Sequence, residues 1–326
     1  MAGSLPRSPS PPPAIVDAHH HLYELDRPGE HRYPWLQDEV DAHFFMGDYA
    51  LIRRSYRAAD YRADTARQNI VATVHVEAER ARDDQVGETA WLSGVQRAEG
   101  FPHAIVAHAW FHTPQAADIL AAQAAFPLVR GIRSKPVTAA TPDAPFPRGA
   151  GSMHDDQWLR GYALLERHGL SWDLRVPYWH LKEAAEVARA FPRTPVVLNH
   201  TGFPWDRSPA GIAAWREAME LLAARPNVHV KISEFGLKDA PWELESNRAV
   251  VLETIRIFGM QRCMFASNFP VAGLRIGYDA LVAAMQDILA PFDADAQDAF
   301  FRRNALAFYR IVPPAPGSTI HRGDET

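Results

Sequence analysis

The chain has 326 residues, of which 47% are hydrophobic, and a formal net charge of −5. Its lysines and arginines are scattered rather than clustered, which argues against a nucleic-acid-binding surface, and no apolar run reaches the ~18 residues that a membrane span needs. The single cysteine, Cys263, excludes an internal disulfide and suits a reducing compartment. We therefore expect a cytoplasmic protein, a monomer or homodimer, with a small molecule as its partner and neither nucleic acid nor membrane.

Both ends of the chain differ in composition from its middle. Residues 1–13 are rich in Ser and Pro, and residues 313–326 begin with a Pro-Pro-Ala-Pro-Gly stretch. Neither segment has the apolar content that a packed core needs, so we expect two disordered tails. The remaining residues, 14–312, are expected to form a single domain.

Short β-branched, apolar runs recur along this domain and alternate with segments of helical periodicity. The expected strands are Ile15–Leu22, Ile70–Glu77, Ala104–Phe111, Leu128–Lys135, Ser171–Pro177, Pro195–Gly202, Val228–Phe235 and Cys263–Pro270. The clearest expected helices are Asp156–His168, Leu181–Phe191, Ile212–Arg225 and Arg248–Phe258. Eight strand–helix units predict an α/β fold of the (β/α)8 TIM-barrel type. The alternative, a doubly wound open sheet, is disfavoured because no Gly-x-Gly-x-x-Gly turn follows the first run.

Ionisable and amide side chains gather at the C-terminal end of nearly every expected strand. Examples are His75 and Glu77, Arg133 and Lys135, Asp173 and Arg175, Asn199 and His200, and Ser267 and Asn268. Because the active sites of TIM-barrel enzymes lie at this end, the pattern indicates an enzyme. The connection from Tyr23 to Asn69 is unusually long and aromatic. It is expected to form either a lid over the pocket or a fixed cover, with Tyr33 and Trp35 among the residues that contact the substrate.

The first expected strand ends in Asp17-Ala-His19-His20-His21. Alternate side chains of a strand share a face, so His19 and His21 point the same way. Two neighbouring imidazoles can share a metal ion or polarise one substrate group.

Several motifs in this order resemble the amidohydrolase superfamily (amidohydrolase-related family 2), in particular its branch of sugar-acid lactonases and 2-pyrone-4,6-dicarboxylate lactonases. They are Asp17-x-His19-x-His21, Tyr33-Pro-Trp35-Leu, Gly131-Ile-Arg133, Leu198-Asn-His200-Thr-Gly, Val230-Lys231-Ile-Ser233, Ser267-Asn268-Phe-Pro-Val and the closing Phe301-Arg-Arg-Asn304-Ala-Leu-Ala-Phe-Tyr309. The resemblance covers about Ile15 to Ile311.

Two departures from the superfamily pattern concern the metal and the base. Where the superfamily usually has an aspartate that binds metal and activates water, this chain has Asn268, and the histidine expected on the fifth strand is replaced by Asp173 or Arg175. The resemblance therefore implies either no cofactor or one divalent metal such as zinc, held by His19, His21 and His200. A neutral amide cannot take the proton. The remaining candidates for the base are Glu77, a neutral histidine and zinc-bound hydroxide.

The resemblance implies a hydrolase that acts on the carboxylic ester bond of a lactone. Catalytic roles fall to His19, His21, His200, Asn268 and Glu77, and Arg133, Lys135 and Arg175 suggest an anionic or sugar-acid substrate. Two alternatives remain open: metal-dependent decarboxylation of an unsaturated or aromatic acid, and a non-catalytic ligand-binding barrel. Strand alternation further predicts that either Lys231 or Glu234, but not both, faces the barrel interior.

Overall fold

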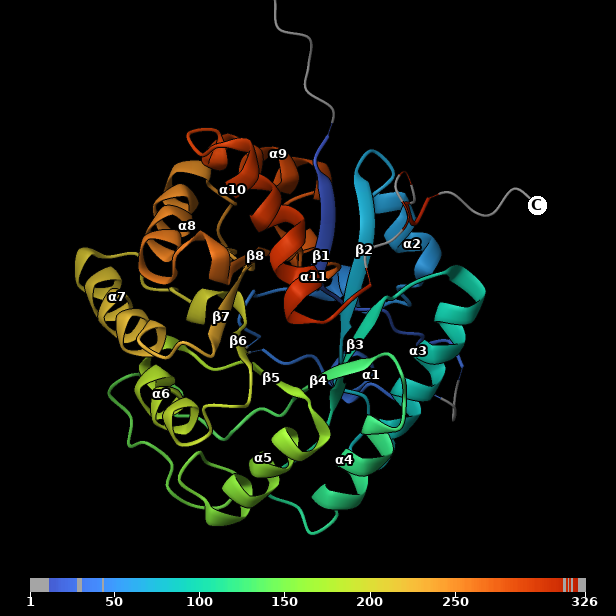
Figure 1. Ribbon diagram of the computed structural model, residues 1–326, viewed down its shortest axis with the longest axis vertical. Coiled ribbons are helices and arrows are strands. Elements are labelled where there is room, and N and C mark those ends of the chain that lie inside the picture. Colours follow the sequence, from blue (N-terminus) through green and yellow to red (C-terminus); the bar gives the residue numbers. More distant parts are fainter. Residues whose placement is uncertain are drawn as a thin grey trace, which may run out of the picture.

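Eight parallel strands form a barrel in the computed structural model, and the helices surround it (Figure 1). The structure describes residues 12–27, 31–42, 44–312, 315, 317 and 319–321. Each strand pairs with its successor in the chain, which confirms the TIM barrel. The strands are β1 Ala14–His20, β2 Asn69–Val76, β3 Ala104–His108, β4 Val129–Arg133, β5 Ser171–Leu174, β6 Val196–Leu198, β7 Val228–Ile232 and β8 Cys263–Phe265.

The seam between β8 and β1 is closed by residues that follow the last strand. The amide of Asn268 donates to the carbonyl of His19 at 2.8 Å, and the amide of His21 donates to that of Phe269 at 2.8 Å. The buried carboxylate of Asp17 supplements these bonds. It accepts from the backbone amide of Ser267 at 2.9 Å and from its hydroxyl at 2.6 Å. Asp17 therefore ties the first strand to the segment that carries Asn268.

Helices α2 to α9 follow one another around the barrel in chain order, and α11 lies across one end of it (Figure 1). They are α1 Pro34–Gln37, α2 Ala58–Asp64, α3 Gln85–Glu99, α4 Ala116–Ala124, α5 Asp156–His168, α6 Leu181–Ala190, α7 Pro209–Ala223, α8 Leu244–Phe258, α9 Tyr278–Leu289, α10 Ala294–Asp298 and α11 Asn304–Phe308. Helix α5 has the predicted bounds. Helix α7 begins earlier than predicted, because the Ser208 hydroxyl accepts from the amide of Gly211 and Pro209 occupies the first helical position.

At the end where the strands begin, the barrel interior is filled by α11 and by the residue that follows it. Phe308 and Tyr309 pack with small and branched side chains of the strands. The hydroxyl of Tyr309 donates to the carboxylate of Asp173 at 3.1 Å, and Lys231 donates to the same carboxylate at 2.5 Å. Both charged side chains are fully buried. The floor of the barrel is thus a buried ion pair, covered by the end of α11 and by Tyr309 directly after it.

The first connection, between β1 and β2, covers part of the opposite end of the barrel. Trp35, on α1, stacks on Phe44 and Tyr49, and its indole nitrogen donates to the carbonyl of Ala78 at 2.8 Å. The connection between β4 and α5 forms a second wall, where the amide of Ala139 donates to the imidazole of His180 at 2.8 Å. Both long loops are therefore anchored to the barrel.

The two expected tails lie largely outside the described residues. Where the structure describes the second, Ile320 is buried, its amide donates to the carbonyl of Ile70 at 3.1 Å, and its carbonyl accepts from Arg62 at 2.9 Å. Within the described part of the chain, no helix is long and apolar enough to cross a membrane.

Candidate active site

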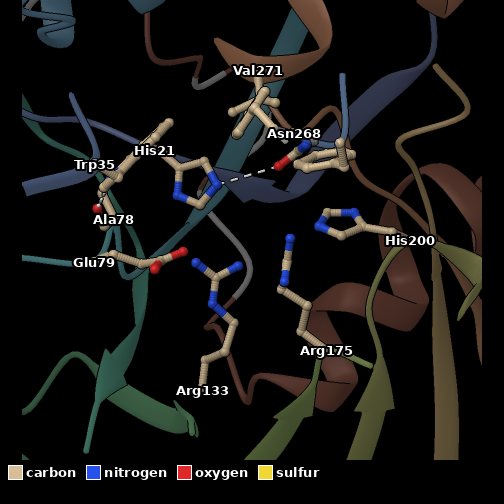
Figure 2. Close-up of a pocket in the computed structure, with 11 residues that line it drawn as sticks. His21, Trp35, Ala78, Glu79, Arg133, Arg175, His200, Asn268 and Val271 are labelled. Atoms are coloured by element: carbon tan, nitrogen blue, oxygen red, sulfur yellow. Dashed lines mark hydrogen bonds between the residues drawn. The ribbon is translucent and has the colours of Figure 1, made fainter. Parts of the chain in front are cut away.

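A pocket of about 420 Å³, its open mouth included, lies at the C-terminal ends of the strands. Its lining comes from β1, β2, β4, β5, β6 and β8 or the residues that follow them, together with the first connection (Figure 2). The lining residues are His21, Trp35, Phe44, Phe45, Ala78, Glu79, Arg133, Arg175, His200, Asn268 and Val271. The pocket therefore combines an aromatic wall with histidines and cations.

Three histidine rings lie next to one another at the inner end of this pocket. The ring centroid of His19 is 5.0 Å from that of His21 and 4.7 Å from that of His200. His200 shares a hydrogen bond with the Ser233 hydroxyl through Nδ1 at 2.9 Å, which leaves Nε2 free to act on a bound molecule. Burial, reinforced by nearby cationic side chains, lowers the pKa of all three well below the usual value. The rings are thus neutral at neutral pH.

Arg133 is fixed on the pocket wall by Glu77. The guanidinium donates through Nε to the Glu77 carboxylate and through Nη2 to the Glu77 carbonyl, the latter at 2.5 Å. Burial opposes ionisation of Glu77, but Arg133 and other nearby cations outweigh it and lower its pKa. Glu77 does not line the pocket. It orients Arg133, and its carboxylate is not placed to activate a water there.

Lys135 is paired in a similar way, because its ammonium group donates to the carboxylate of Glu79. Arg175 differs from both. Its guanidinium carbon lies 5.1 Å from the ring centroid of Phe203 and 5.6 Å from that of Phe45, and no carboxylate of the described residues pairs with it. Figure 2 shows its guanidinium directed into the pocket beside that of Arg133. Arg175 is thus available to a negatively charged ligand.

Asn268 joins His21 to a carboxylate that does not line the pocket. Its side-chain oxygen lies 3.2 Å from Nε2 of His21, and its side-chain nitrogen donates to Glu234 (Figure 2 shows the first contact). Burial raises the pKa of Glu234 to about 7. A carboxylate is therefore present at the site, on the loop after β7 instead of at the end of β8.

Several residues of the site have a left-handed backbone. The φ angles are +60° at Glu79, +60° at His200, +53° at Glu234 and +58° at Asn268. Such angles are costly for residues with a β-carbon and tend to occur at functional sites. They turn each side chain away from the direction that strand alternation would give it. For this reason Lys231 and Glu234 both point inward, contrary to the prediction that only one of them would.

Comparison with known proteins identifies the family. The model of the amidohydrolase family, described as "Amidohydrolase", matches residues 16–311. The chain belongs to the amidohydrolase family. It is 40% identical to the uncharacterized protein y4mH of Sinorhizobium fredii over 91% of this chain and 99% of that one.

Two more distant amidohydrolase relatives have names that state a function or a ligand. An L-fucono-1,5-lactonase of Burkholderia ambifaria is 28% identical over 92% of this chain and 97% of its own. A crystal structure of an amidohydrolase from Burkholderia multivorans with bound zinc has a TM-score of 0.75 and 24% identity, over 92% of this chain and 100% of that one. The similarity to this crystal structure supports the fold, which the strand order already shows.

The histidines of this amidohydrolase do not fit a resident metal in their present arrangement. Within the described ranges, no three His, Cys, Asp or Glu side chains are grouped to hold a metal ion. His21 uses both ring nitrogens, Nδ1 toward the Val76 carbonyl at 2.7 Å and Nε2 toward Asn268, while those of His19 have no hydrogen-bond partner. The nearby Lys231 and Arg133 would also repel a cation. The expected zinc set of His19, His21 and His200 is therefore not supported, and we derive no step through a metal.

The other expected site residues separate into two groups. His21, His200, Asn268, Arg133, Arg175 and Trp35 meet in the pocket. Tyr33 is instead fully buried against Tyr23, and His19, Glu77 and Lys135 are not among the residues that line the pocket. Sequence reasoning missed Phe44, Phe45 and Glu79. Two features of the sequence could have pointed to them: the aromatic pair on the long first connection, and the acid just beyond the end of a strand.

Proposed function

We propose that this amidohydrolase hydrolyses a lactone that carries a carboxylate or belongs to the sugar acids. The observation that carries the proposal is the pocket itself, where the unpaired guanidinium of Arg175 lies beside neutral histidines and the fixed guanidinium of Arg133. The similarity to an L-fucono-1,5-lactonase supports the reaction class.

In this proposal His200 is the group that activates water. A neutral imidazole can accept a proton at neutral pH, whereas the amide of Asn268 cannot. Nε2 of His200 takes a proton from water, and the hydroxyl oxygen bonds to the acyl carbon. The ring C–O bond then breaks and the proton passes from His200 to the departing oxygen. The product is a hydroxy acid.

The two arginines interact with different negatively charged groups during the reaction. Arg133 is held by Glu77 and can stabilise the oxygen that becomes negative when water adds to the carbonyl. Arg175 is available to bind the charged or hydroxylated end of the substrate. The aromatic wall of Trp35, Phe44 and Phe45 covers the apolar face of the ring.

The test is a pH-indicator assay of acid release over a panel of sugar-acid and carboxylated lactones. We expect turnover by the wild type and a loss of at least about a hundredfold in His200→Asn, the range that general acid–base groups supply. His168→Asn, at the last position of α5, serves as the matched control. Unchanged activity in His200→Asn would show that His200 does not activate water. Release of carbon dioxide from an unsaturated acid, or thermal stabilisation by lactones without turnover, would instead support the decarboxylase or the binding protein.

A further inference from the structure

The proposed reaction assigns no task to Glu79, the only acid among the described residues that line the pocket. Its side chain is 47% exposed, and its carboxylate points into the pocket (Figure 2). Lys135 donates to one carboxylate oxygen, Oε1, and no described residue donates to the other, Oε2. The pocket thus offers a ligand a free acceptor oxygen in addition to the guanidinium of Arg175.

Glu79 is fixed in the pocket by the same carboxylate that fixes Arg133, that of Glu77. The backbone of Glu79 has a φ angle of +60°, and its amide donates to one oxygen of Glu77 at 2.8 Å. The other oxygen of Glu77 accepts from Arg133. A left-handed backbone is costly at a residue with a β-carbon, and such residues cluster at functional sites. The acid and the guanidinium of this wall are therefore held in a fixed relation to each other.

The charge of Glu79 restricts the ligand atoms that can face it. Desolvation opposes its ionisation, but Lys135, Arg175 and Arg133 outweigh this effect and lower its pKa well below the usual value. An ionised carboxylate can only accept, so the ligand atom that meets Oε2 has to carry a hydrogen. A hydroxyl group meets this requirement, whereas a second carboxylate would be repelled.

We propose that Glu79 is a specificity-determining residue, which accepts a hydrogen bond from a substrate hydroxyl while Arg175 binds the substrate carboxylate. The inference rests on the proposed function and narrows its substrate class to hydroxylated lactones that carry one carboxylate. Lactones with two carboxylates and no hydroxyl lack the donor and meet the repulsion of Glu79. Lys135 acts indirectly, because it holds the acid that selects the hydroxyl and is thereby kept from binding a substrate carboxylate.

Calorimetric titration of the full-length protein with open-chain acids tests this selection without turnover. Gluconate has one carboxylate and several hydroxyls, hexanoate has the carboxylate alone, and adipate has a carboxylate at each end of a chain of the same length. Glu79→Met, of similar length but unable to hydrogen-bond, should weaken gluconate binding by about tenfold or more and leave hexanoate binding no weaker. It should strengthen adipate binding, since the repulsion is gone and Lys135 is released.

Further variants keep the result interpretable. Glu79→Gln should shift the affinities in the same directions by less, and it serves if the Met variant does not fold. Glu79→Met combined with Lys135→Met should bind gluconate as weakly as Glu79→Met does, but should lose most of the gain for adipate. This double variant separates the recognition of hydroxyls from the release of Lys135. The exposed Glu245→Gln is the matched control.

Steady-state kinetics on lactones complete the test. Glu79→Met should raise KM for a hydroxylated lactone with one carboxylate by about tenfold, with kcat within about twofold, and should change KM little for the lactone without hydroxyls. An equal fall in kcat on both lactones would show that Glu79 takes part in proton transfer and would overturn the proposal. Equal gluconate binding by the wild type and both Glu79 variants would overturn it too. Absence of any lactone turnover by the wild type would count against the proposed function alone, because the titrations do not depend on turnover.

Discussion

Arg175 is the residue on which the substrate preference of the pocket is expected to depend. Arg133 and Lys135 each have a carboxylate partner of their own, whereas Arg175 lies against the rings of Phe45 and Phe203. Contact with aromatic rings positions the guanidinium without neutralising it. The charge is therefore reserved for a ligand.

We expect Arg175→Gln to raise KM for carboxylated lactones by about ten- to hundredfold, the value of a charge-assisted hydrogen bond. The KM for uncharged lactones should change little, because only the anionic group loses its partner. Steady-state kinetics on matched pairs of lactones measure the difference. Arg160→Gln, on the exposed face of α5, is the control. Equal losses on charged and uncharged lactones would show that Arg175 is not selective for charge.

Glu88 gives the fold a dependence on pH that is independent of catalysis. It is buried on α3 and accepts from the amide of Ala78 at 2.9 Å. Burial, with Glu77 nearby, raises its pKa to about 8, against 4.5 for an ordinary glutamate. Between these values the unfolded chain has lost a proton that the folded protein keeps, so the contribution of Glu88 to the free energy of unfolding falls as pH rises and levels off above about 8.

Urea unfolding of the wild type and of Glu88→Gln at pH 5 and at pH 8 measures this contribution as the difference between the two proteins, at no more than about 1.4 kcal/mol per pH unit. The buried neutral histidines stabilise both proteins alike as pH rises through the ordinary histidine pKa, so their effect cancels in the difference. Glu88→Gln cannot ionise, so it should lose this part of the decline while still accepting from Ala78. The stability of the variant relative to the wild type should therefore be higher at pH 8 than at pH 5. Parallel pH profiles of the wild type and Glu88→Gln would contradict the prediction, because they would mean that Glu88 is already ionised in the folded protein.

At the scale of elements, two glycines inside helices have opposite surroundings. A β-carbon at Gly161, in α5, would lie 2.2 Å from the carbonyl oxygen of Phe111, a backbone atom that cannot easily move. A β-carbon at Gly94, in α3, would meet only the end of the Arg97 side chain at 3.8 Å. Close approach to the barrel requires glycine in α5 but not in α3.

Gly94→Ala should stabilise the protein by about 0.5–1 kcal/mol, the difference in helix propensity. Gly161→Ala should destabilise it in spite of the same propensity, because α5 has to move away from Phe111. Thermal or urea unfolding of the two variants side by side measures both signs. A gain in stability from Gly161→Ala would mean that the contact between α5 and Phe111 is loose.

The elements themselves were largely predictable from the sequence, but side-chain partners were not. Apolar runs such as Val196–Leu198 are buried on both faces, so local pattern alone locates the strands. The partner of Arg133 is Glu77, which belongs to a different strand and cannot be read from local spacing. The prediction that only one of Lys231 and Glu234 faces inward failed for another reason. Strand β7 ends at Ile232, and the left-handed backbone at Glu234 breaks the alternation on which the prediction depended.

At the scale of the whole molecule, one buried acid supplements the main-chain bonds that close the barrel between β8 and β1. Beyond its bonds to Ser267, the Asp17 carboxylate accepts from Tyr61 on α2 at 2.7 Å and from Tyr278 on α9 at 3.2 Å. It therefore joins β1, the segment after β8 and two outer helices. Its removal would leave several buried donors without a partner.

Asp17→Ala should lower the free energy of unfolding by at least about 3 kcal/mol, since each unsatisfied buried donor costs about 1–3 kcal/mol. Asp17→Asn keeps one acceptor and should lose less. Urea unfolding measures both, and native-state hydrogen exchange at the amides of His21 and Asn268 should show faster opening of the seam. Unfolding midpoints equal to that of the wild type would indicate that the main-chain bonds alone close the barrel.

The cover over the barrel floor also bears on how this protein matures during synthesis. The Lys231–Asp173 pair is shielded from water by Tyr309, which is translated long after either partner. Until the segment carrying α11 and Tyr309 has left the ribosome, this ion pair lacks the side chains that shield it from water. Every residue that lines the pocket precedes α11 in the chain, so the floor of the barrel is completed only after the pocket residues have been synthesised.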